Sequence, residues 1–148
     1  MTYKLMILAY LLAALTNGVG FVMALKGSEK GTKTFGWMGL ALVLTGLGIG
    51  IGMMVMAWIE MGQPPFRTLY QSLIFFSVTT AIVFLFAGRR SVVLGLGTGL
   101  FIVAILTYGY LQRDTRAVYL PPALQSGWFV PHVVVYFLGY SALFVSFI

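Results

Sequence analysis

The segment that decides the fold is Leu120–Ile148, LPPALQSGWFVPHVVVYFLGYSALFVSFI. It opens with a proline pair that disfavours helix, and from Trp128 onward it is apolar almost without interruption. About 20 apolar residues are enough for a helix to cross the hydrocarbon core of a membrane. We therefore predict a membrane-spanning helix over residues 128–148, entered through residues 126–127 as its cap.

The composition extends this prediction to the whole chain. Of the 148 residues, 60% are hydrophobic and only 8% are charged, which is unlike any ordinary water-soluble domain. The N-terminal apolar run is longer than a typical signal-peptide core, so it is predicted to be a membrane helix. We expect an all-α polytopic transmembrane helix bundle forming one domain, residues 1–148. Its five helices are predicted at about 5–25, 35–59, 69–86, 92–110 and 128–148, with outer loops at 60–68 and 111–127.

Charge and cysteine content exclude several classes of function. The net charge of +6 is spread over short loops, so it concerns membrane orientation and the lipid bilayer. Basic residues do not form a patch interleaved with aromatic residues, and we predict no nucleic-acid partner. The chain has no cysteine, which excludes disulfides, thiolate nucleophiles and cysteine-ligated metals.

The distribution of lysine and arginine predicts an orientation. Loops after the first and third helices carry five of these residues, and the other side carries four. Because the five are concentrated in two tight loops, we predict that those loops are cytoplasmic. The two outer loops and His132 would then share the opposite face. The five are Lys26, Lys30, Lys33, Arg89 and Arg90.

Glycines recur in the second and fourth predicted helices. The run Gly46–Gly52, GLGIGIG, lacks the GxGxxG spacing and the strand-loop-helix context of a nucleotide-binding loop. Its glycines instead form pairs four residues apart, which allow a neighbouring helix to approach closely. We predict such packing for 46 with 50, for 48 with 52, and for 95 with 99.

His132 is the only histidine and the leading candidate for a ligand. Pro131 before it is tolerated in the first turn of a helix, which places His132 there too. The positive end of the helix dipole favours a neutral imidazole, the form that binds metals. Trp128, His132, Tyr136 and Tyr140 are spaced four apart, so they form one aromatic stripe that could wall a flat apolar ligand. The alternative is that these residues are only interfacial anchors.

The loop between the second and third helices contains the other candidates. Trp58, Phe66 and Tyr70 would form an aromatic rim, with Glu60 and Arg67 among them. Glu60 is interpreted as a solvated carboxylate, because no second acid is placed for general acid/base chemistry. Arg67 could bind a carboxylate or simply reach the interface.

Two stretches resemble one family. Residues 64–77, PPFRTLYQSLIFFS, resemble the P-x-x-N-L-Y-E-S-L-x-F-F-S stretch of CcsA/ResC-type cytochrome c biogenesis proteins. Residues 122–144, PALQSGWFVPHVVVYFLGYSALF, resemble that family's P-A-L-Q-S-x-W segment and the histidine that follows it, with the Trp-x-x-x-His spacing intact. Gln71 stands where the family often has glutamate.

The resemblance implies a haem-handling role in System II cytochrome c maturation. Family members present haem b at the outer face of a bacterial inner membrane or a thylakoid-type membrane, for thioether attachment to the CxxCH motif of an apocytochrome c. By the same resemblance, His132 would be an axial ligand of the haem iron, and a CcsB/ResB-type membrane protein would be the partner. No catalytic residue is assigned.

The family also has a tryptophan-rich WWD domain and a second external histidine, which this sequence lacks. We therefore expect this chain to be an N-terminal portion or one piece of a split protein, and part of a haem lyase only together with the rest. The alternative function is a small structural or assembly subunit of a membrane complex with no haem of its own. A transporter or channel is disfavoured, since no charged residue falls in mid-helix.

Overall fold

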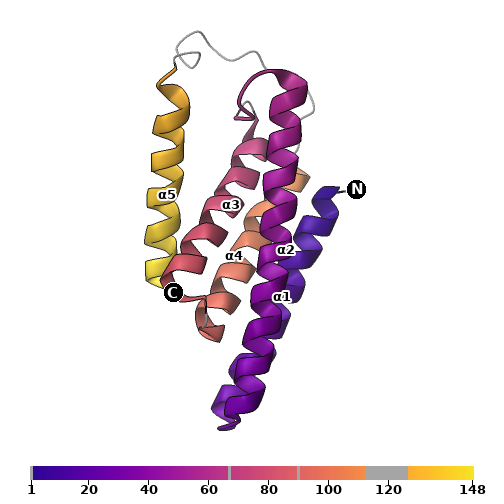
Figure 1. Cartoon of the computed structure of the whole chain (residues 1–148), viewed down its shortest axis with the longest axis vertical. Helices are drawn as coiled ribbons and strands as arrows, with labels where there is room; N and C mark the ends of the chain where they lie inside the picture. The colour runs from indigo at the N-terminus through magenta and orange to yellow at the C-terminus, as the bar shows by residue number, and fades with distance from the viewer. Residues whose placement is uncertain (1, 67, 90, 113–126) are drawn as a thin grey trace.

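The described part of the protein is a bundle of five long α-helices. A computed structural model describes residues 2–66, 68–89, 91–112 and 127–148, and those residues contain no strand. All five helices are long and apolar enough to cross a membrane, which confirms the predicted all-α transmembrane bundle (Figure 1). The helices are α1 (Thr2–Leu25), α2 (Glu29–Met61), α3 (Leu69–Gly88), α4 (Val92–Leu111) and α5 (Phe129–Phe147).

The second helix is longer than predicted at both ends. α2 begins at Glu29 because the Ser28 side chain accepts a hydrogen bond from the Gly31 N–H at 3.4 Å, which satisfies one of the free N–H groups of the first turn. It continues to Met61 and stops where Gly62 adopts a left-handed conformation, φ 61°. Glu60, predicted in a loop, therefore lies in the last turn of this helix.

The start of α5 also differs from the prediction. Its N-cap is Trp128, which makes no side-chain capping hydrogen bond, instead of the pair at 126–127. Of that pair, residue 126 lies outside the described residues, as does nearly all of the predicted loop 111–127. Arg67 and Arg90 are outside them as well.

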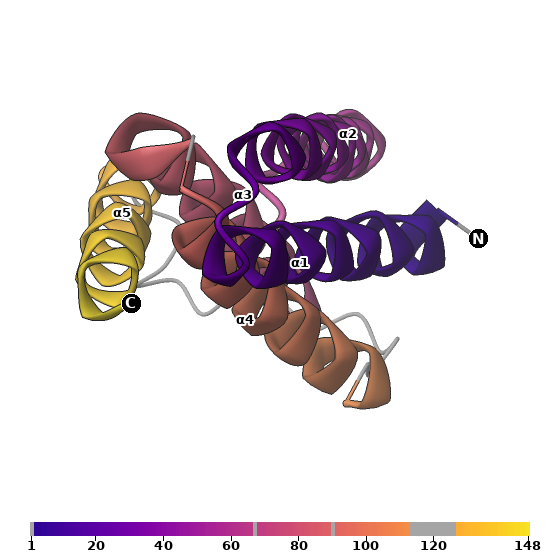
Figure 2. The same cartoon turned by 90° about the horizontal axis from the view of Figure 1, so that it is seen from below.

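Successive helices run in opposite directions, so the turns alternate between the two ends of the bundle (Figure 1). Viewed along the bundle, α1 lies between α2 and α4, while α5 lies at the edge beside α3 (Figure 2). The main cluster of buried apolar residues begins at Tyr3 in α1 and extends to Leu106 in α4, and apart from this cluster α5 buries Val145. The main cluster thus belongs to the first four helices.

Two of the three predicted glycine pairs are packing seams. A Cβ on Gly46 of α2 would lie 2.8 Å from Tyr10 ring atoms of α1, and a Cβ on Gly50 would lie 2.8 Å from Val78 of α3 and 3.2 Å from Met6 of α1. Gly95 and Gly99 of α4 face α1 in the same way. For the third pair, Gly48 with Gly52, no atom of the described residues lies within 4 Å of an added Cβ, so the predicted packing is not present in the described bundle. The two α2 pairs differ because they lie on different faces of one helix, and only one face turns to the bundle.

A buried amide fills the contact between the three central helices. Asn17 of α1 is 3% exposed, and its Nδ2 donates to the Ala13 carbonyl at 2.8 Å. Its amide lies against Gly39 of α2 and Gly95 of α4, where any larger residue would overlap it. The absence of side chains at these two glycines leaves the space that Asn17 occupies.

Candidate functional site

His132 lies in the first turn of α5, as predicted. Pro131 before it is the third helical residue, a position whose N–H would have had no partner within the helix. The His132 N–H is the first to close a helical bond, donating to the Trp128 carbonyl at 3.2 Å. The histidine is therefore held at a fixed height at the end of α5.

The aromatic stripe extends down one face of α5. The imidazole and the Tyr136 ring have centroids 4.4 Å apart at an interplanar angle of 50°, and the Tyr136 and Tyr140 centroids are 6.1 Å apart. This face points away from the other helices, since Trp128 is 82% exposed and the two tyrosines about half exposed. The stripe is thus open to whatever lies beside α5.

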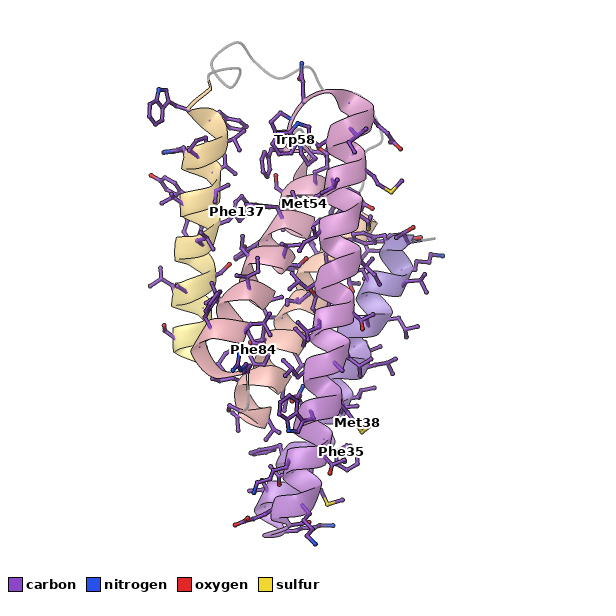
Figure 3. All side chains as sticks on the ribbon, viewed as in Figure 1. Phe35, Met38, Met54, Trp58, Phe84 and Phe137 are labelled. Atoms are coloured by element: carbon purple, nitrogen blue, oxygen red, sulfur yellow. The ribbon has the colours of Figure 1, made fainter. Side chains whose placement is uncertain are left out.

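The opposite face of α5 determines this orientation. Phe137 points from α5 toward α3 (Figure 3), and its ring meets both Phe75 and Phe76 at 5.4 Å between centroids. Phe144 stacks on Phe101 of α4 at 3.7 Å. Aromatic contacts of this kind therefore hold one face of α5 against the bundle and leave the His132 face outward.

A buried hydroxyl cluster reinforces the same packing. Ser141 is fully buried, and its Oγ lies 2.9 Å from Thr79 Oγ1 and 3.1 Å from Thr80 Oγ1 of α3. Hydrogen bonds between helices hold them in register where no water competes. The contacts with α3, together with the stacking of Phe144 on Phe101 of α4, therefore determine the height and the rotation of α5.

The two stretches that carry the family resemblance meet in space. Phe66, in the turn between α2 and α3, has its ring 6.3 Å from Phe129 of α5 and 4.9 Å from Phe75 of α3. The α2–α3 turn and the start of α5 lie at the same end of the bundle (Figure 1). Sequence reasoning predicted the shared end but missed Phe66 as the link. The available signal was the pair Phe75 and Phe76, because adjacent rings on one helix can reach different partners. Phe75 contacts Phe66 and Phe137, and Phe76 contacts Phe101 and Phe137.

The other candidates in the α2–α3 region divide into exposed and packed residues. Glu60 and Trp58 are exposed at the end of α2, in agreement with a solvated carboxylate and an interfacial indole. Tyr70 instead turns inward and packs on Tyr3, 4.6 Å between centroids. Gln71 donates through Nε2 to the Met61 sulfur at 3.7 Å. Of the predicted aromatic rim, Trp58 is exposed, whereas Phe66 and Tyr70 are half-buried.

The donor set limits the kind of metal group that this end can hold. In the described part of the chain, no three residues among His, Cys, Asp and Glu are grouped as metal ligands, whereas a bare zinc ion usually needs three or four protein ligands. A haem iron already has four porphyrin nitrogens and needs only axial ligands. One accessible imidazole beside aromatic rings therefore fits a haem better than a bare metal ion.

Together these features define a polytopic helical membrane protein with an accessible histidine and an aromatic face at one end. Among curated proteins, the chain is similar to the cytochrome c biogenesis protein CcsA of Oenothera argillicola, 35% identical over 121 residues. The match covers 78% of this chain and 34% of that protein. The CcsA proteins of Nicotiana tomentosiformis (36% over 96 residues, 62% of this chain and 31% of that protein) and Chlorella vulgaris (28% over 121 residues, 78% and 38%) match as well.

These similarities confirm the resemblance to the CcsA-type family over most of the chain. The chain spans about a third of the length of the curated relatives it matches. No family model matches it. No solved structure matches it either.

Proposed function

We propose that this chain is a haem-handling membrane component of cytochrome c maturation, which presents haem b at the outer membrane face. The names of its relatives support a role in cytochrome c biogenesis. The observation that carries the finer proposal is the accessible His132 at the head of the open stripe of Tyr136 and Tyr140. His132 lies near the contact between the α2–α3 turn and the start of α5, so the two stretches that resemble the family meet at this site.

In this proposal, the residues of α5 have separate roles. His132 supplies a neutral imidazole nitrogen as an axial ligand of the haem iron. Tyr136, Tyr140 and Trp128 supply an aromatic surface for the flat apolar face of the porphyrin. Among the described residues, none hydrogen-bonds to the imidazole nitrogens, so the ring is available to an incoming ligand.

The role of the His132 end of the bundle would be to present haem to apocytochrome c. Each thioether forms when a cysteine S–H of the CxxCH motif adds across a haem vinyl group, so no atom leaves. The chain's part is to hold haem with its vinyl edge accessible to apocytochrome c. We propose a CcsB/ResB-type protein as the membrane partner, and a bacterial inner membrane or thylakoid-type membrane as the location.

The test is the visible absorption spectrum of the full chain, purified in detergent and supplied with haem b. We expect a Soret band that is lost in His132→Ala, that returns when imidazole is added to this variant, and that shifts in His132→Met. Tyr108→Leu is a matched control, because Tyr108 is a half-exposed tyrosine on α4. It should leave the spectrum unchanged, whereas Tyr136→Leu should weaken haem retention. Normal haem content in His132→Ala would contradict the ligand assignment, and no haem binding at all would favour a structural or assembly subunit.

A further inference from the structure

A second polar site lies at the end of the bundle opposite His132. A cavity of about 230 Å³ opens between the first turns of α2 and the end of α3. Two of its lining residues are cations: Lys33 lies in α2, and Arg89 is the residue that caps the end of α3. The complete lining is Thr32, Lys33, Gly36, Trp37, Leu40 and Arg89.

The charge at this end favours an anion. Lys33 is paired only with Glu29, at 3.6 Å, and both side chains are largely exposed, so the pair is weak and leaves the lysine available. Lys26 and Lys30 add further positive charge nearby. In the described part of this end, four cations therefore face one carboxylate. The Thr32 hydroxyl donates to the Ser28 carbonyl at 2.9 Å, so the two cations would supply the donors for a bound anion.

The apolar side chains around the cavity favour a lipid over a free ion. Trp37 is 61% exposed, and indole rings concentrate at the headgroup level of membranes. An adjoining hollow shares Arg89 and is lined by Leu85 and Phe86, and Phe86 is 88% exposed. Cations at the rim with exposed apolar side chains beside them match a headgroup followed by acyl chains.

We propose that this cavity binds the phosphate of an anionic glycerophospholipid, with Lys33 and Arg89 contacting the phosphate and Trp37 and Phe86 contacting the acyl chains. Lys33 holds the anion from α2 and Arg89 from the cap of α3, so the bound lipid bridges α2 and the end of α3. Inorganic phosphate has the same anionic chemistry and could use the cations alone. The test therefore has to separate these two sources.

The experiment uses Trp37 as the reporter. The chain has three tryptophans, so Trp58→Phe with Trp128→Phe leaves Trp37 alone, and both replaced residues lie at the other end. The protein is reconstituted in phosphatidylcholine vesicles that contain a rising fraction of brominated phosphatidylglycerol or, for comparison, brominated phosphatidylcholine. Quenching of Trp37 by each brominated lipid gives the preference of the site.

We expect brominated phosphatidylglycerol to quench Trp37 well beyond brominated phosphatidylcholine. Lys33→Gln and Arg89→Gln should each lower this preference about fivefold, since one cation near a membrane surface contributes about that factor. Lys26→Gln with Lys30→Gln is the matched control, because it removes two charges from the same end without changing the cavity lining.

An equal loss of preference in the control variant would mean that only the general surface charge attracts the lipid, and it would overturn the site. If inorganic phosphate abolishes the preference, and quenches or shifts Trp37 emission in detergent through Lys33 and Arg89, free phosphate is the ligand and the lipid assignment is overturned. No preference in vesicles and no response to phosphate would overturn the anion site altogether.

Discussion

Replacing Gly39 by alanine should destabilise the bundle through a single identifiable overlap. The new Cβ would lie 2.7 Å from Asn17 Cγ and 2.9 Å from its Oδ1, with Nδ2 closer still. Ordinary contact at such a position begins near 3.4 Å, so Cγ alone is 0.7 Å too close (3.4 less 2.7). Asn17 has little room to move aside, because its amide also lies against Gly95 of α4, where an added Cβ would come within 2.6 Å of Oδ1.

The expected loss follows from overpacking. Forcing an extra methyl into a filled core costs about 1–3 kcal/mol, which is a factor of roughly 5 or more in the unfolding equilibrium. Gly48→Ala is the control on the same helix. No atom of the described residues lies within 4 Å of a Cβ at this position, so this variant should be as stable as the wild type or slightly more stable, because alanine is the better helix former.

The assay is reversible unfolding in mixed micelles with increasing sodium dodecyl sulfate, followed by far-ultraviolet circular dichroism. A double-mutant cycle identifies the cause: Asn17→Ala should recover most of the loss in Gly39→Ala, since it removes the group that is overlapped. The reasoning is refuted if Gly39→Ala is no less stable than Gly48→Ala, or if Asn17→Ala fails to restore it.

Three further changes test the attachment of α5 and the surface charges. Ser141→Ala should lower the free energy of unfolding by about 0.6–1.7 kcal/mol and speed hydrogen exchange of the α5 amides. Ser146 is exposed and bonded within its own helix, so Ser146→Ala should change neither the unfolding free energy nor the exchange rate. Phe66→Ala should cost at least about 0.5–1.5 kcal/mol in aromatic contacts and raise the exchange rate of the first turn of α5; an unchanged rate would show that the turn and helix are not coupled. Glu29→Gln should leave the unfolding free energy almost unchanged, because its pair with Lys33 is exposed and screened; a measurable loss would contradict that interpretation.

Hydropathy was sufficient for the fold because the five apolar runs are long and the charges fall near their ends. The relative rotation of the helices could not be predicted, since the residues that face lipid are as apolar as those that face other helices. The two glycine pairs of α2 illustrate this: Gly46 and Gly50 contact other helices, while Gly48 and Gly52 face outward, and no difference between the pairs is visible in the sequence.

For the candidate site, the sequence predicted which residues share a face of α5 but not the direction in which that face points. Their spacing of four residues correctly predicted that His132, Tyr136 and Tyr140 share one face of the helix. What that face meets depends on the packing of the opposite side, where Phe137 and Ser141 contact α3. Those contacts join residues about 60 positions apart in the chain, and spacing within one helix carries no information about them.

The distribution of the core has a consequence for the order of assembly during synthesis. Every residue of the buried core cluster lies between Tyr3 and Leu106, so all its members have been synthesised before α5 leaves the ribosome. The first four helices can then pack into a finished unit while the fifth is still being inserted. The helix that bears His132 would join by its Phe137 and Ser141 face, as the last step, on a surface of α3 that is already in place.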